Sequence, residues 1–129
     1  STPSTNKVQA VIDLAHKQLG KPYVWGAEGP NSFDCSGLIY YVYKNAAGIT
    51  LPRTSSDQYS AGVAVSRSNL KAGDLIFSST DGTGNITHVA IYVGDGQMIH
   101  APRNGKNVEK VSINNSYWNK AYVGARRVL

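Results

Sequence analysis

Cys35 is the only cysteine of the 129 residues, and it stands in the run Ser32-Phe33-Asp34-Cys35-Ser36-Gly37. The following run, residues 38–43, has neither glycine nor proline and can continue as a helix. A cysteine in the first turn of a helix lies beside unpaired backbone N–H groups and the positive end of the helix dipole. In this position, the Cys35 thiol is expected to lose its proton readily, and the thiolate is a nucleophile. On local grounds alone, however, the sequence favours the other interpretation, a small buried apolar cysteine.

Two of the three histidines, His88 and His100, flank a predicted β-hairpin. The dipeptide Asp95-Gly96, typical of tight hairpin turns, separates the strand-like runs 87–93 and 97–101. Pairing across this turn makes the two histidines near neighbours, and both side chains can point to one face if no bulge intervenes. The cysteine helix could then pack against that face. For each histidine alone, an ordinary strand residue bonded to backbone or water is the alternative.

A cysteine, a histidine and a polar third group form the arrangement used for nucleophilic acyl transfer. His88 would take the proton of the Cys35 thiol and later protonate the leaving amine. His100 would hold the His88 ring in one tautomer by accepting its second N–H. A neutral His100 carries no charge to stabilise an imidazolium, so as the third residue it stabilises the charged base less than an aspartate would. A Cys/His/His site for catalytic zinc is the rival interpretation, although no C-x-x-C or H-x-x-x-H spacing supports it.

The first part of the chain predicts the helices that position these residues. Apolar residues at helical spacing predict an amphipathic helix from about residue 5 to residue 19, ended by Gly20 and Pro22. The helix that carries Cys35 should end near Ala47-Gly48. Thr54 should cap a short helix that runs to about residue 61.

From residue 73 onwards, the sequence changes to period-two runs rich in β-branched residues. Strands are predicted over 74–79, 87–93, 97–101, 108–113 and 122–128, with a polar turn at 79–85 and a short connection at 116–118. Helices precede strands, so the predicted fold class is α+β, with N-terminal helices packed on a C-terminal antiparallel β-sheet of about five to six strands.

Length and composition limit the organisation of the chain. A chain of 129 residues can bury one core as a single domain. Residues 1–6 look like the end of a Ser/Thr/Pro linker, so we expect a linker remnant at 1–6 and a domain at 7–129, monomeric and cut from a larger multidomain protein. A single cysteine cannot form an internal disulfide and leaves the compartment open. No apolar run approaches the ~20 residues of a membrane span.

The charge is mildly basic, with a net value of +5 from 13 basic and 8 acidic residues. The basic residues are scattered and form no stripe interleaved with aromatic residues, so we do not expect nucleic acid as a partner. A mildly basic surface suits a polyanionic environment such as a bacterial cell wall.

Six short motifs follow one another along the chain: GKPYVWG at 20–26, FDCSGL at 33–38, LPRTS at 51–55 with Gln58, AGDLIF at 72–77, HVAIYVG at 88–94 and MIHA at 98–101. In this order and spacing, they resemble the NlpC-type family of papain-like bacterial cell-wall cysteine peptidases. The resemblance extends from Lys7 to Leu129 and implies an NlpC-type catalytic domain with a papain-like fold. The opening motif departs from the family pattern at Ala27, where a second glycine is usual.

The resemblance implies that Cys35 is the nucleophile, His88 the base and His100 the residue that orients the base. It also implies that the Tyr23 hydroxyl helps the Cys35 backbone N–H to stabilise an oxyanion. Asp74 is expected to shape the turn into its strand.

The resemblance also implies substrate contacts. Asp34 and Ser36 are expected to hold the amino group of the substrate, and Arg53 and Ser55 to line the groove and contact the stem peptide. A helix cap is the alternative for Asp34, and a surface charge is the alternative for Arg53. The two tryptophans, Trp25 and Trp118, could be groove walls, but we expect buried packing for each.

The activity implied by the resemblance is that of a secreted cysteine peptidase, extracellular or associated with a bacterial cell wall. It would hydrolyse peptidoglycan stem peptides through a thioester acyl-enzyme, first of all between D-γ-glutamyl and the following diamino acid. An N-acetylmuramoyl-L-alanine amidase or a cross-bridge peptidase is the alternative among enzymes. A non-catalytic cell-wall-binding module is the alternative of another class. Neither a cofactor nor a metal is expected.

Overall fold

The structure is a computed structural model that describes the backbone of residues 3–129 and the side chains of residues 7–129. Residues 1 and 2, the start of the expected linker remnant, lie outside the described residues. Helix α1 covers Pro3–Lys17, so it begins inside the segment 1–6 and ends two residues before the predicted end. The boundary between linker and domain stays a prediction.

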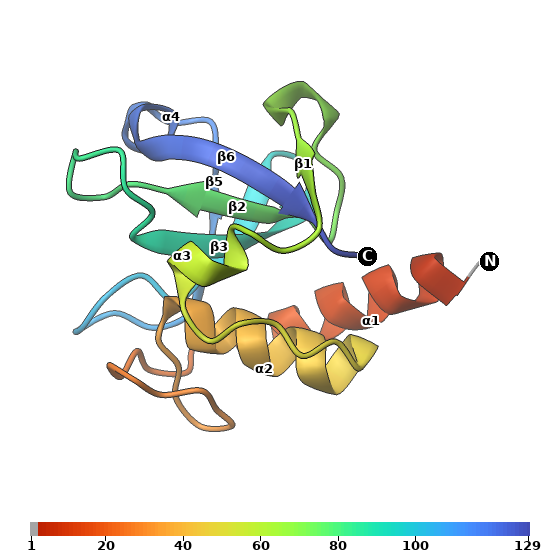
Figure 1. The fold of residues 1–129 in the computed structure, drawn as a ribbon. Coiled ribbons are helices and arrows are strands. Elements are labelled where there is room, and N and C mark those ends of the chain that lie inside the picture. Colours follow the sequence, from red (N-terminus) through yellow and green to blue (C-terminus); the bar gives the residue numbers. More distant parts are fainter. Residues whose placement is uncertain (1–2) are drawn as a thin grey trace.

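The sheet has six antiparallel strands in the order β1-β6-β2-β3-β4-β5. The strands are β1 (Val63–Val65), β2 (Leu75–Ser78), β3 (His88–Gly94), β4 (Gln97–His100), β5 (Glu109–Ser112) and β6 (Tyr122–Arg127). Helices α1 and α2 (Cys35–Ala47) lie on one face of this sheet, with α2 against β3 (Figure 1). The predicted α+β class is confirmed.

Four short elements differ from the prediction. Helix α3 covers only Ser55–Gln58, although Thr54 caps it as expected, with its Oγ1 accepting the Asp57 N–H. Strand β1 and a 3-10 helix at Arg67–Asn69 were not predicted. The expected connection at 116–118 is helix α4 (Ser116–Ala121), which Asn115 caps. Short elements carry few residues of periodic pattern, so neighbouring packing decides them.

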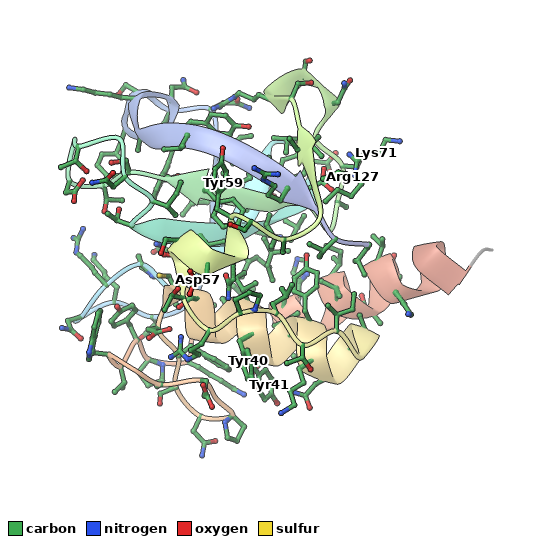
Figure 2. All side chains as sticks on the ribbon, viewed as in Figure 1. Tyr40, Tyr41, Asp57, Tyr59, Lys71 and Arg127 are labelled. Carbon is green, nitrogen blue, oxygen red and sulfur yellow. The ribbon has the colours of Figure 1, made fainter. Side chains whose placement is uncertain are left out.

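Helix α2 has the predicted bounds because both of its ends are capped. At the N-terminus, the Asp34 carboxylate accepts the N–H of Gly37 at 2.6 Å. At the C-terminus, Gly48 has a φ of 70°, the left-handed conformation that glycine adopts without a steric penalty. Tyr40 and Tyr41 project from α2 on the side away from the sheet (Figure 2).

The two faces of the sheet bury different apolar clusters. On the face toward α2, the larger cluster includes Leu75, Phe77, Val89, Ile91 and Ile99 with Leu38, Ile39 and Val42 of the helix. Tyr59 joins this side by an edge contact with Phe77, with ring centroids 5.0 Å apart (Figure 2). The opposite face carries a smaller cluster of Ile76, Ala90, Met98 and Ile113. None of the helices described here combines the length and apolar character needed to span a membrane.

Candidate active site

Cys35 is the first residue of α2, directly after the capping Asp34. The thiol is largely buried, and burial, followed by the negative charge of Asp34, raises its pKa. Backbone N–H groups, first that of Val89, act in the opposite direction but do not prevail. The net effect is a raised pKa, so the expectation that the helix N-terminus makes this thiol lose its proton readily is wrong. The resting thiol is neutral, and a base must take its proton.

The interaction with Val89 locates Cys35 at the start of β3, because Val89 directly follows His88 in this strand. The expectation that α2 packs against the face bearing the histidines is wrong. Val89 and Ile91 pack toward α2, so His88, which alternates with them, belongs to the other face. Cys35 itself lies at the start of β3, beside the backbone of the residue that follows His88.

His88 and His100 are both buried and are hydrogen-bonded to each other, with 2.8 Å between His88 Nε2 and His100 Nδ1. Their ring planes are inclined by 80°. This bond occupies one nitrogen of His88, so Nδ1 is the nitrogen that can serve as a base. Burial and the neighbouring His100 lower the pKa of His88, and burial lowers the pKa of His100. Both rings are therefore neutral at neutral pH.

A one-residue β-bulge at Val93 gives the two histidines their common face. Counted from the hairpin turn without a bulge, His100 would pair with Ile91 and lie on the face opposite to His88. With the bulge, Ile91 pairs with Ile99, and His100 moves to the face of His88. The condition that no bulge intervenes was wrong, because the bulge itself corrects the register.

Trp118 of α4 covers the histidine pair. Its ring stacks on His88, with centroids 5.4 Å apart and planes inclined by 27°, and it meets His100 edge to face at 5.2 Å. The expected packing role of Trp118 agrees with these contacts, although its side chain is only half-buried. Trp25 departs from its expected burial, since its side chain is 81% exposed.

A cleft of about 400 Å³ brings together the other predicted site residues. It is lined by Tyr23, Asp34, Cys35, Ser36, Arg53 and Ser55, together with the exposed Trp25. The two histidines do not line this cleft. His100 instead borders a neighbouring hollow of about 520 Å³, with Trp118 in its wall. Six of the eight predicted residues thus share one cleft, and the histidine pair lies beside it.

Asp34, Arg53 and Ser36 form one hydrogen-bonded group. The Arg53 guanidinium donates to Asp34 through Nη2 at 2.9 Å and Nη1 at 3.1 Å, and to the Ser36 hydroxyl at 2.8 Å. Its Nε donates to Glu28 at 2.8 Å. Asp34 also accepts the Gly26 N–H at 3.0 Å. Asp34 therefore acts as the helix cap of the alternative interpretation. Its predicted contact with substrate, like that of Ser36, stays a prediction.

Tyr23 lies beside the nucleophile because residue 23 forms a bridge with Phe33, two residues before Cys35. Burial, followed by the charges of Cys35 and Asp34, raises the pKa of the Tyr23 hydroxyl. The hydroxyl therefore stays protonated and able to donate a hydrogen bond near the sulfur, as the oxyanion role requires.

Glu109 is a neighbour of the site that the sequence analysis missed. Its Oε2 lies 2.9 Å from His100 Nε2, so the described side chains form a line from His88 through His100 to Glu109. The pairing of strands β4 and β5 is the signal that would have identified it, because this pairing places His100 directly opposite Glu109. Only knowledge of which strand lies next to β4 would have found it.

The described side chains, those of residues 7–129, contain no group of three or more His, Cys, Asp or Glu placed to hold a metal ion. The cysteine and two histidines of the rival zinc interpretation therefore do not form such a group. The arrangement instead offers a neutral thiol, a neutral imidazole with one engaged nitrogen and nearby hydrogen-bond donors.

Comparison with known proteins gives a single family. The sequence pattern of the NlpC/P60 family matches residues 20–127. The murein DD-endopeptidase MepH of Escherichia coli is 47% identical over 130 residues, covering 95% of this chain and 48% of that protein. The gamma-D-glutamyl-L-lysine dipeptidyl-peptidase of Bacillus cereus is 47% identical over 120 residues, covering 92% of this chain and 36% of that protein. The chain thus spans about half or less of these relatives.

Solved structures show the same fold. An NlpC/P60 family protein from Bacillus cereus matches with a TM-score of 0.89 and 44% identity, covering 95% of this chain and 40% of that one. The NlpC/p60 domain of the peptidoglycan hydrolase SagA matches with a TM-score of 0.81 and 39% identity, covering 92% of this chain and 97% of that one. The first match is to part of a longer chain and the second to an isolated domain.

Proposed function

Because the chain belongs to the NlpC/P60 family of cysteine peptidases, we propose that it hydrolyses peptidoglycan stem peptides with Cys35 as nucleophile and His88 as base. The observation that carries this proposal is the geometry at the start of β3. There, the only cysteine meets the strand that begins with His88, whose second nitrogen is held by His100 at 2.8 Å. The names of both relatives, a murein endopeptidase and a glutamyl-lysine peptidase, agree with this substrate class.

In the first half of the reaction, the Cys35 sulfur attacks the carbonyl carbon of the scissile amide. A C–S bond forms, the thiol proton passes to His88 Nδ1, and the carbonyl π electrons move onto the oxygen. Tyr23 and the backbone N–H of Cys35 donate hydrogen bonds to that oxyanion. When the oxyanion collapses, the C–N bond breaks and His88 returns the proton to the leaving amine.

In the second half, water hydrolyses the thioester. His88 accepts a proton from the water as its oxygen attacks the acyl carbon, and the C–S bond then breaks. The proton on His88 passes to the departing thiolate, which restores the neutral thiol. Because every proton goes through Nδ1 of His88, the ring must keep that nitrogen unprotonated at the start of each half.

For the scissile bond, we favour the amide between D-γ-glutamyl and the next diamino acid, which the name of the Bacillus cereus relative supports. A γ-linked glutamyl residue keeps a free α-carboxylate close to the scissile carbonyl. Arg53 is a cation in the wall of the same cleft as Cys35, and its side chain is 32% exposed. This cation can meet the α-carboxylate, whereas Asp34 and Ser36 hold the guanidinium in place.

A cross-bridge peptidase is the second candidate, and the name of the Escherichia coli relative favours it. A D-alanyl acyl group has no carboxylate beside its scissile carbonyl, so it leaves Arg53 without a substrate partner. We also propose an extracellular or cell-wall location for the whole protein, since both substrates occur there.

The test is digestion of defined muropeptides that contain both bonds, with identification of the products by mass spectrometry. A Cys35-dependent cut after D-γ-glutamate supports the full proposal. A cut only in the cross-bridge would support the proposed mechanism, but the scissile bond would then be the cross-bridge amide. Absence of any cut, with Cys35 inert to alkylation, would favour the non-catalytic wall-binding module.

A further inference from the structure

We propose that Glu109 is a positioning residue that sets the tautomers of His100 and His88 and supplies the negative charge that a histidine in third position lacks. The inference rests on the proposed roles of Cys35 and His88. Glu109 touches neither of them in the proposed reaction and acts only through His100.

Two hydrogen bonds carry the proposal. His88 Nε2 lies 2.8 Å from His100 Nδ1, and His100 Nε2 lies 2.9 Å from Glu109 Oε2. His100 is 1% exposed, so its two ring nitrogens depend on these two partners. The Glu109 side chain is 43% exposed, so water still solvates its carboxylate.

The direction of both hydrogen bonds follows from the carboxylate. An ionised carboxylate only accepts, so the Glu109 partner, Nε2 of His100, must carry the proton. A neutral imidazole has one N–H, so His100 Nδ1 has a lone pair and accepts from His88 Nε2. The proton of neutral His88 is then on Nε2, and Nδ1 is left as the base. Without Glu109, the pair could reverse, which would put a proton on Nδ1 of His88 and block it as a base.

The charge of Glu109 acts in the same direction as its hydrogen bond. Burial lowers the pKa of His88 and so destabilises the imidazolium that forms during catalysis. Glu109 raises the pKa of His100 through its hydrogen bond and its charge. The other charged side chains around this hollow are Arg103 and Lys106, which oppose a cation on the histidine pair. Glu109 is the carboxylate that offsets them.

The first test measures tautomers directly, by long-range nitrogen–proton NMR of the 129-residue chain labelled with nitrogen-15 in histidine. The chain has three histidines, so substitution of each assigns the signals. At neutral pH, we expect protons on Nε2 of His88 and of His100. Glu109→Ala should move His100 toward the Nδ1–H tautomer or a mixture, whereas Glu109→Gln, which can still accept, should preserve it. Unchanged tautomers in Glu109→Ala would overturn the proposal.

The second test separates the charge from the hydrogen bond through the pH dependence of kcat/KM. Loss of the charge destabilises the imidazolium, so Glu109→Gln should move the acidic limb to lower pH. Glu109→Ala should lower the plateau by about tenfold, equivalent to ~1.4 kcal/mol. Asp13→Asn on α1 makes the same change in net charge at an exposed position and should match the wild type. A lower plateau without any move of the limb in Glu109→Gln would assign Glu109 a structural role only.

A readout without substrate keeps this proposal distinct from the proposed function. The rate at which iodoacetamide alkylates Cys35, the sole cysteine, reports proton transfer to His88. Glu109→Ala should slow that alkylation at neutral pH relative to wild type and Asp13→Asn. If the wild type cuts no muropeptide but the tautomers and alkylation rate still depend on Glu109, the proposed substrate is wrong and the role of Glu109 holds. If it cuts and both readouts ignore Glu109, only this proposal is wrong.

Discussion

Asp34 and Arg53 are joined by two hydrogen bonds, of 2.9 Å from Nη2 and 3.1 Å from Nη1 of the guanidinium. The same carboxylate accepts the N–H of Gly37 and so caps the helix that begins with Cys35. One buried acid therefore starts the nucleophile helix and anchors the cation of the cleft. This coupling makes Asp34 a stability determinant whether or not it touches substrate.

Asp34→Ala should lower the free energy of unfolding by roughly 2 kcal/mol or more. It removes an N-cap, which contributes about 1 kcal/mol, and leaves the half-buried Arg53 without its main partner. Urea unfolding followed by circular dichroism measures the change. Asp57→Ala, an exposed acid on α3, is the matched control. A loss for Asp34→Ala no larger than for this control would contradict the capping role.

Cys35→Ala should abolish muropeptide cleavage and leave the fold intact. The substitution removes the sulfur and replaces a small side chain with another small one, so we expect no large change in the unfolding midpoint. Product analysis by mass spectrometry and a thermal melt are the two measurements. Residual turnover at the wild-type rate would exclude Cys35 as the nucleophile.

His88→Ala should reduce kcat/KM more than His100→Ala. Loss of the general base removes a factor of about a hundred or more, whereas loss of the orienting residue leaves His88 Nδ1 in place and should cost about tenfold. Both side chains are buried, so the unfolding free energies of the two variants must be compared alongside their kinetics. Equal kinetic losses at equal stability would contradict this division of roles.

The parts of the site that local sequence determines were predictable. Asp34, Cys35 and the glycine at position 48 lie within one helix and its caps, so motif and bounds agreed with the structure. The sheet face on which both histidines lie depends on a bulge at Val93. No residue pattern predicts a single extra residue in a strand. The even residue numbers of His88 and His100 suggested the right face, but for the wrong reason, because that prediction assumed a strand without a bulge.

Features that depend on packing between distant segments were beyond the sequence. The pKa of Cys35 is raised because the folded chain buries it beside Asp34, and the helix N-terminus does not outweigh this burial. Glu109 becomes part of the site only because β5 pairs with β4. Trp25 is exposed in a loop although aromatic residues usually pack inside.

The acidic limb of kcat/KM should lie below pH 6.5, the ordinary pKa of histidine. Burial and His100 lower the pKa of His88, so the base stays unprotonated until the pH falls through that lowered value. On the alkaline side, the raised pKa of Cys35 keeps the thiol protonated, which preserves a broad plateau. A pH–rate profile on a defined muropeptide checks both limbs, and an acidic limb above pH 6.5 would contradict the effect of burial.

Stability at low pH is the control for this profile. The unfolded chain binds protons on His88 and His100 below about pH 6.5, whereas the folded chain does so only at lower pH, so the free energy of unfolding falls as the pH drops below that value. Unfolding curves at each pH identify the range in which loss of activity reflects protonation of His88 and not loss of the fold.

A free α-carboxylate on the D-γ-glutamyl residue should lower KM. Arg53 lies in the wall of the cleft, and a charge-assisted hydrogen bond to a carboxylate is stronger than one to a neutral amide. Paired muropeptides with D-glutamate or D-isoglutamine at this position, which differ only in that group, should therefore differ by about tenfold in KM. In Arg53→Gln the difference should disappear, with the stability of the variant measured in parallel because Asp34 loses its partner. Equal KM values for the two substrates in the wild type would show that Arg53 does not contact this group, and the cross-bridge would then become the favoured bond.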